Sequence, residues 1–186
     1  MKYLNVFVVL VALFLAACSK KAYTVDAVGN TNINPAKANT YGFASQVDNK
    51  LDEGFFFLND LMLKAEIRDA VKHEMDSRGY THTPSQPDLI VNFRVFDKPA
   101  EIQSVDQLGS NYWAAGEING YTTPETVRLK EGSLMVHLVD RKTGKLVWQG
   151  YASGLMDGNA FTKGGNKIDE AVSLVFDKFN YRADNL

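Results

Sequence analysis

The sequence has few of the residues that most often carry protein chemistry. Cys18 is the single cysteine among 186 residues, so no intramolecular disulfide can form and no cysteine pair can hold a metal ion. The three histidines, His73, His82 and His137, are far apart, and none falls in a zinc-protease or other short ligand pattern. We therefore expect no metal site and no cofactor, and we find no recognisable catalytic residue.

An excess of charge of one sign is also missing. The chain has 20 Lys and Arg against 22 Asp and Glu, with a formal net charge of −2 and no basic stripe, so nucleic acid is not expected as a partner. Hydrophobic residues make up 45% and charged residues 23% of the chain, which is ordinary for a globular protein. There is no internal repeat. This composition favours one folded domain.

One long apolar run is present, and it lies at the N-terminus. Residues 3–15 follow Lys2 and lead into the sequence Leu-Ala-Ala-Cys that ends at Cys18. The run is shorter than the ~20 residues that cross a bilayer, and it is typical of a secretory signal. Its end resembles the lipobox of bacterial lipoprotein precursors, in which the cysteine thiol accepts a diacylglycerol. We expect residues 1–17 to be a cleaved signal peptide and Cys18 to become the lipidated first residue.

The residues after Cys18 bear on where the chain is held. Residues 18–39 are mostly polar and are expected to form a tether. Two or more acyl chains such as palmitate give stable membrane attachment, at about 0.8 kcal/mol per buried CH₂. An aspartate directly after the lipidated cysteine would resemble an inner-membrane retention signal, but this chain has Ser19 at that position. The expected location is the periplasmic face of the outer membrane.

Residues 40–186 show the pattern of a single α+β domain. Strands are expected at 40–44, 88–96, 132–139 and 145–153, with a turn at 140–144 in which Gly144 takes a positive φ. Apolar residues at three- and four-residue spacing predict one helix ending at Gly79 and a second near the C-terminus. The strands before and after the first helix should be parallel. Together these elements predict a two-layer fold, a mixed sheet of four to five strands with both helices on one face.

Residues 97–130 are expected to form a long loop, with an extended segment at its end, at 126–129. Such a loop inside a compact domain is uncommon and is often functional. It contains Tyr112, Trp113 and Tyr121, and exposed aromatic residues are enriched where proteins bind partners. These three residues are candidates for contact with an envelope protein or a glycan. The alternative is that they only cover the sheet.

Three segments carry a family resemblance. They are Asp-Leu-Ile-Val at 88–91, Gly-Ser-Leu-Met-Val-His-Leu-Val-Asp at 132–140, and Lys-Thr-Gly-Lys-Leu-Val-Trp-Gln-Gly-Tyr-Ala at 142–152. They resemble the bacterial lipoprotein family catalogued as domain of unknown function 4136. Asn180 and Tyr181 stand where that family is expected to have paired prolines. The resemblance implies a location and an architecture but no activity.

Two glycine-containing segments partly resemble known motifs, one a catalytic serine turn and the other a phosphate-binding loop. Residues 150–154 resemble the Gly-x-Ser-x-Gly turn that carries a nucleophilic serine, but Ser153 is the fourth residue of this segment and the motif has its serine third. Residues 158–167 precede a helix but lack the ending of a phosphate-binding loop. Three functions stay open: a membrane-tethered, non-enzymatic binding or assembly module, a hydrolase of envelope material, and a small-ligand carrier. A flat or shallow surface that bears Tyr112 and Trp113 favours the first function, an acid–base pair in a deep cleft favours the second, and a closed apolar cavity favours the third.

Overall fold

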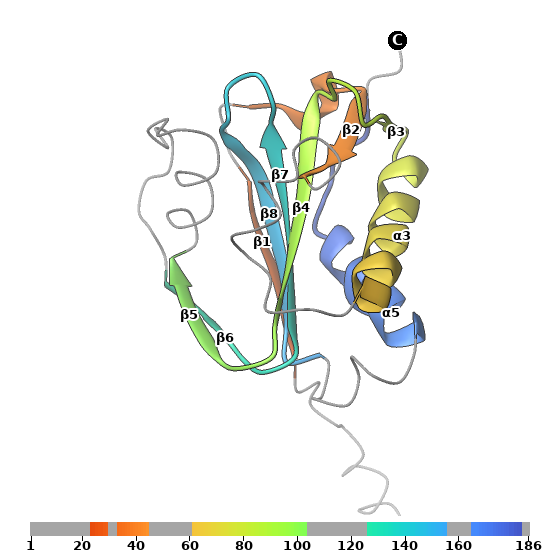
Figure 1. Ribbon diagram of the computed structural model, residues 1–186. Coiled ribbons are helices and arrows are strands. Elements are labelled where there is room, and N and C mark those ends of the chain that lie inside the picture. The colour runs from red at the N-terminus through yellow and green to blue at the C-terminus, as the bar shows by residue number, and fades with distance from the viewer. Residues whose placement is uncertain (1–22, 30–32, 45–60, 104–125, 156–164, 184–186) are drawn as a thin grey trace, which may run out of the picture.

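The computed structural model describes residues 23–29, 33–44, 61–103, 126–155 and 165–183. These residues form a six-stranded sheet, a separate two-stranded sheet and two long helices that both lie on one face of the larger sheet (Figure 1). The predicted two-layer α+β architecture is confirmed. The N-terminal 22 residues, including Cys18, and the aromatic residues Tyr112, Trp113 and Tyr121 lie outside the described residues.

The larger sheet is mixed, as predicted, and has the strand order β1-β8-β7-β4-β2-β3. β2 runs parallel to β4, which confirms the expected pairing of the strands on either side of the first helix, whereas the β4–β7, β7–β8 and β1–β8 pairs are antiparallel. The sheet has more strands than the four or five expected because β1 and the two-residue β3 extend its edges. In chain order the elements are β1 (Thr24–Gly29), η1 (Pro35–Lys37), β2 (Thr40–Phe43), α3 (Leu61–Ser77), β3 (Thr81–His82), β4 (Leu89–Phe96), β5 (Ala100–Gln103), β6 (Thr126–Leu129), β7 (Ser133–Asp140), β8 (Leu146–Ser153) and α5 (Gly165–Phe176).

The main core lies between this sheet and the two helices. Alternate residues of β4 and β7 point to the helices, as the period-two pattern of their sequences predicts. Trp148 of β8 is 2% exposed and lies 5.7 Å from Phe176 and 5.1 Å from Phe179, measured between ring centroids. The helices contribute apolar residues one turn apart, all at most 2% exposed: Leu63, Ile67, Val71 and Met75 from α3, and Ile168, Ala171, Val172, Val175 and Phe176 from α5.

Glycines end one helix and shape one hairpin where the sequence predicted them. Gly79, with φ of 86°, lies two residues beyond the end of α3. Gly144, with φ of 67°, lies in the turn between β7 and β8. Both conformations are left-handed, where a side chain is disfavoured. Among the described residues, no helix is both long enough and apolar enough to span a membrane.

The segment expected to be a long loop is partly regular, and its end at 126–129 is extended, as expected. Its first part contains β5, which pairs with β6 in an antiparallel two-stranded sheet. Ile102 and Val127 from this small sheet form a second apolar cluster with Phe96, Met135 and Tyr151 of the main sheet. The short β5 segment has only one large apolar residue, Ile102, so its strand signal in the sequence was weak. The contact places β5 and β6 over the sheet face opposite the helices (Figure 1).

Candidate functional site

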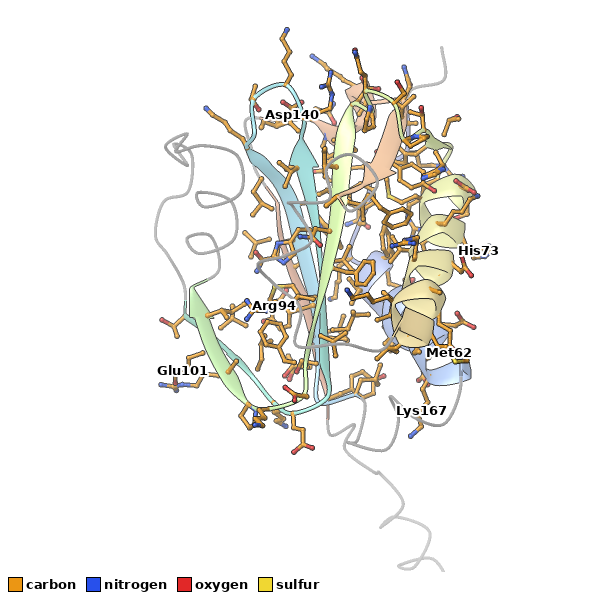
Figure 2. The ribbon with its side chains drawn as sticks, in the orientation of Figure 1. Met62, His73, Arg94, Glu101, Asp140 and Lys167 are labelled. Atoms are coloured by element: carbon orange, nitrogen blue, oxygen red, sulfur yellow. The ribbon has the colours of Figure 1, made fainter. Side chains whose placement is uncertain are left out.

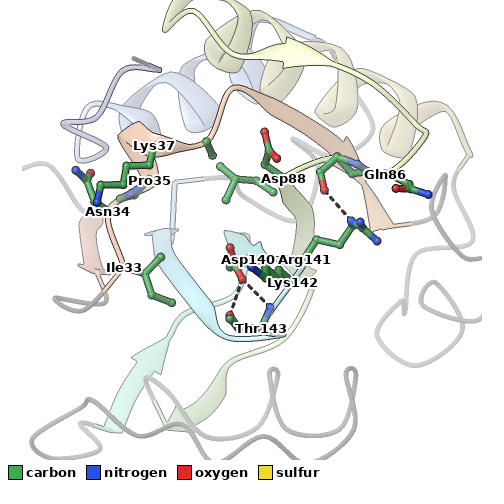
Figure 3. A pocket seen from close by; sticks show the side chains of 13 residues that line it. Ile33, Asn34, Pro35, Lys37, Gln86, Asp88, Asp140, Arg141, Lys142 and Thr143 are labelled. Carbon is green, nitrogen blue, oxygen red and sulfur yellow. Dashed lines mark hydrogen bonds between the residues drawn. The ribbon is translucent and has the colours of Figure 1, made fainter. Parts of the chain in front are cut away.

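A hollow of about 730 Å³ lies at the end of the main sheet where β4 begins and β7 turns into β8 (Figure 3). Its floor contains the buried residues Pro35, Ala38, Pro87 and Leu89. Its polar rim comes from η1, from the segment before β4 and from the β7–β8 turn. The polar residues that line it are Asn34, Lys37, Gln86, Asp88, Asp140, Arg141, Lys142 and Thr143.

Asp88 ties the start of β4 to the start of β2. One oxygen of its carboxylate, Oδ2, accepts hydrogen bonds from the backbone amides of Asn39 and Thr40, each at 3.0 Å, and from the Thr40 hydroxyl at 2.7 Å. Burial alone would raise the pKa of Asp88. The hydrogen bonds from Thr40 and the two amides, together with the charge of Arg141, outweigh that effect and lower the pKa below its ordinary value. Asp88 is therefore a fixed, ionised group.

The β7–β8 turn is held in a similar way. Asp140 Oδ1 accepts hydrogen bonds from the amide of Thr143 at 2.7 Å and from its hydroxyl at 2.6 Å. The Arg141 amide donates to the carbonyl oxygen of Asp88, and Arg141 Nε donates to that of Pro87, both at 2.9 Å (Figure 3). These two hydrogen bonds hold the turn against the chain before β4. The bond from the side chain uses only Nε, so it leaves the two terminal nitrogens of the guanidinium available.

Gln86, at the rim, has a strained backbone. Its φ is 49°, and it is the one residue other than glycine with a positive φ in the part of the chain that the structure describes. A left-handed conformation costs roughly 1–2 kcal/mol for a residue with a side chain. Such strain is often retained at functional sites, where the surrounding structure holds it in place. At this position it sets the chain direction just before Pro87 and Asp88.

The positive and negative side chains of the hollow differ in whether they already have partners. Lys37, Arg141 and Lys142 are exposed, and none takes part in an ion pair among the described residues. The two carboxylates, by contrast, already accept hydrogen bonds from their own neighbours. A general acid or base needs a pKa near the working pH, whereas the pKa of Asp88 is lowered. The arrangement is suited to holding a ligand by charge and hydrogen bonding.

The histidines do not form a site together. His73 is exposed on α3, His82 lies in β3 with its ring 5.3 Å from that of Tyr41, and His137 is buried in β7. His73 lines a separate hollow of about 450 Å³ with acidic residues of α3 and α5. No group of three or more potential ligands fit to hold a metal occurs among the described residues.

Ser153, the serine of the nucleophile-like segment, is 2% exposed at the end of β8. Its hydroxyl accepts a hydrogen bond from the amide of Lys130 at 2.9 Å and lies 3.3 Å from the hydroxyl of Ser133. These bonds join the end of β8 to the β6–β7 connection. The segment at 158–167 lies mostly outside the described residues.

A row of polar side chains lies on the sheet face opposite the helices, and its alignment depends on strand pairing that the sequence did not predict. Asn92, His137 and Gln149 are paired in register across β4, β7 and β8. Arg94 lies two residues after Asn92 in β4 and so on the same face of the sheet. Figure 2 shows Arg94 on the side away from α3 and α5. His137 and Gln149 are 4% and 2% exposed, and their Nε2 atoms have no hydrogen-bond partner in the part of the chain that the structure describes. Burial, and then the charge of Arg94, lower the pKa of His137 to about 3, so its imidazole is neutral.

The hollow was also missed, for a topological reason. Residue 88 was expected to start a strand and residues 140–144 to form a turn. Only the pairing of Leu89 with Asp140 brings these two segments together. The order of strands in the sheet was not predicted, so the shared end of β2, β4 and β7 carried no sequence signal.

Fold and site together define a two-layer α+β domain with an open hollow, polar at its rim, at one end of its sheet. Residues 25–180 match the family model described as a domain of unknown function, DUF4136. Because that match covers most of the chain, the chain belongs to the DUF4136 family. The resemblance of the three sequence segments is thereby confirmed.

Solved structures agree with this assignment. A crystal structure of a DUF4136 family protein from Bacteroides thetaiotaomicron VPI-5482 has a TM-score of 0.58 at 16% identity, covering 88% of this chain and 99% of that one. At this identity the likeness shows the fold alone. A PDZ domain protein from Parabacteroides distasonis (TM-score 0.49, 13% identity, 86% of this chain and 36% of that one) and a PelC dodecamer from Paraburkholderia phytofirmans (0.46, 10%, 87% and 99%) are more distant. No curated protein matches this chain.

Proposed function

We propose that this chain is a lipid-anchored, non-enzymatic binding or assembly module of the bacterial cell envelope. The observation that carries the proposal is the hollow at the end of the sheet. It presents Lys37, Arg141 and Lys142 to solvent, while its carboxylates are held by their own neighbours. This is a surface for recognition. It offers neither the poised acid–base pair of a hydrolase nor the enclosed apolar cavity of a carrier.

The anchor is supported by the sequence before the domain. The apolar run at 3–15 and the lipobox-like residues that end at Cys18 favour export and acylation at that cysteine. We place the chain at the periplasmic face of the outer membrane. In addition to the hollow, the aromatic residues Tyr112, Trp113 and Tyr121 remain proposed contacts for an envelope protein or glycan.

The first residue of β1 and the hollow lie at opposite ends of the sheet. Thr24, the first residue of β1, pairs with Ser153 at the end of β8, whereas the hollow lies beside the turn that precedes Leu146 at the start of β8. The eight residues of β8 span roughly 26 Å at about 3.3 Å per residue. Cys18 lies six residues before Thr24, a reach of at most about 20 Å. A short link from Cys18 to Thr24 favours an orientation in which the hollow points away from the anchoring membrane.

Acylation is tested by metabolic labelling with an alkyne fatty acid in cells that produce the wild-type chain, Cys18→Ser or the control Ser19→Ala. We expect label and membrane recovery for the wild type and the control, and neither for Cys18→Ser. A labelled Cys18→Ser chain would contradict the proposed anchor.

Recognition at the hollow is tested by a photo-crosslinking amino acid placed at Lys142 or, as a control, at Lys98. Lys98 is equally exposed but lies beyond the other end of β4. We expect crosslinked adducts in intact cells from position 142 and none of the same mass from position 98. Adducts common to both positions, or absent from position 142, argue against a binding role for the hollow.

A further inference from the structure

The end of the sheet opposite the hollow is formed by the first and last residues of four strands. Phe96 at the end of β4 pairs with Ser133 at the start of β7, and Ser153 at the end of β8 pairs with Thr24 at the start of β1. The hydroxyls of Ser133 and Ser153 are 3.3 Å apart, which joins the two pairs. We call this end of the domain the anchor end, because Thr24 lies six residues after Cys18.

Both long helices begin at the anchor end. Figure 2 shows Met62, in the first turn of α3, and Lys167, in the first turn of α5, at the end of the molecule away from Asp140, which ends β7 beside the hollow. Met62 is 74% exposed and is the only large hydrophobic side chain that is exposed in the part of the chain that the structure describes. Neither of these first helical turns contains an acidic residue.

The connections and first helical turns at the anchor end carry a positive net charge. The β4–β5 and β6–β7 connections are balanced, because each has one exposed lysine and one exposed carboxylate: Asp97, Lys98, Lys130 and Glu131. The exposed Lys167 of α5 adds a positive charge, and Lys20 and Lys21 add two more in the sequence just after Cys18. Cations this close to an anionic lipid surface are attracted to it, and the attraction falls off within a Debye length.

The link to the lipidated residue is short compared with the domain. Six residues reach at most about 20 Å when fully extended, whereas the eight residues of β8 alone span roughly 26 Å. The anchor end is therefore the part of the domain that the link keeps nearest to the lipid headgroups. An exposed apolar side chain suits the boundary between headgroups and acyl chains, and a lysine can lay its apolar stem there while its amine reaches the phosphates.

We propose that the anchor end rests on the anionic headgroups of the membrane that holds Cys18, with Met62 at the boundary of the acyl chains and the lysines at the lipid phosphates. This contact rests on the proposed acylation of Cys18 and adds a second, reversible membrane signal to the covalent one. It fixes the tilt of the domain, so the hollow at the other end of the sheet is held toward the space beyond the membrane.

The test uses the full-length acylated chain in lipid vesicles, with a fluorophore attached to Ala65→Cys. Ala65 is exposed and lies one turn after Met62, and acylation of Cys18 leaves the new cysteine as the one free thiol. Spin-labelled headgroups quench a fluorophore that lies at the membrane surface. We expect quenching to be at least about twofold stronger in vesicles that contain phosphatidylglycerol than in phosphatidylcholine alone, because anionic headgroups attract the lysines. A fluorophore at Lys142→Cys, in the β7–β8 turn, should not be quenched.

Variants of the chain labelled at position 65 separate charge from mere proximity. Lys98→Glu, Lys167→Glu should remove the difference between the two kinds of vesicle, because it places like charges against the headgroups. The control Lys37→Glu, Lys178→Glu makes the same change of net charge at exposed positions away from the anchor end and should leave the difference unchanged. Added salt should weaken quenching of the chain that carries neither double change, since exposed charges are screened, and this measurement needs no charge variant to fold.

Each contrary result has a distinct meaning. Equal quenching at position 65 in both kinds of vesicle, or an equal loss in both double variants, overturns the headgroup contact and leaves the lipid anchor standing. Quenching at position 142 as strong as at position 65 also overturns it, because the domain then has no fixed end toward the membrane. An unlabelled wild-type chain in the fatty-acid experiment instead overturns the anchor itself, and the headgroup contact with it.

Discussion

The two faces of the main sheet are both buried, but they are built from different side chains. The buried residues of the face toward α3 and α5 are mostly apolar, and Trp148 packs there against Phe176 and Phe179. The opposite face carries His137 and Gln149, whose Nε2 atoms have no hydrogen-bond partner among the described residues. A buried polar atom without a partner costs about 1–3 kcal/mol. The comparison indicates that the helix-covered face provides the stability of the fold, and that the other face retains polar groups at a cost.

The largest effect is expected on the apolar face. Trp148→Ala removes a fully buried indole and should lower the free energy of unfolding by about 3–5 kcal/mol. Urea unfolding followed by circular dichroism measures this loss. A midpoint equal to that of the wild type would show that the aromatic cluster does not support the core.

An intermediate effect, dependent on pH, is expected on the opposite face. The ordinary pKa of histidine is 6.5, and burial lowers that of His137 to about 3. The unfolded imidazole therefore takes up a proton below pH 6.5 while the folded one stays neutral, so stability is lost as the pH falls from about 6.5 to about 3. His137→Leu removes this dependence. The difference in the free energy of unfolding, His137→Leu minus wild type, should therefore rise by about 2 kcal/mol when the pH is lowered from 7 to 5.

Urea midpoints of both chains at the two pH values give that difference directly. The other titrating groups are common to the two chains, so their contributions cancel in the comparison. Parallel pH profiles of the wild type and His137→Leu would mean that the folded imidazole is protonated more easily than its burial implies.

The smallest effect is expected in the two-stranded sheet that covers part of the polar face. Arg128 and Glu101 form an ion pair across β5 and β6, with an N–O distance of 2.7 Å and side chains 82% and 64% exposed. Exposed pairs contribute less than about 1 kcal/mol, so Arg128→Ala should scarcely move the urea midpoint. A loss comparable to that of Trp148→Ala would show that β5 and β6 are as important to the core as the helices.

Periodicity was sufficient to predict much of the fold. The residues of β4, β7, β8 and both helices repeat their apolar positions clearly, and Gly79 and Gly144 mark the ends of elements. β3 has two residues and β5 has four, which is too short for a period to show. The hollow depends on strand order and on the pairing of Leu89 with Asp140, neither of which is written in a local pattern. The alternation of residues in β7 puts His137 on the face away from the helices. Its burial could not be predicted, because it depends on what covers that face.

The position of β1 has a mechanical consequence. β1 is joined to β8 by six residue pairs, and its first residue lies at the end of the sheet away from the β7–β8 turn. If Cys18 is held by a membrane and a partner pulls at the turn, the force runs along the strand axes in opposite directions on β1 and β8. Hydrogen bonds between antiparallel strands are perpendicular to those axes, so all of them are loaded in shear together and none is peeled open first. A pull between anchor and partner therefore meets the sheet in the direction in which it resists rupture best.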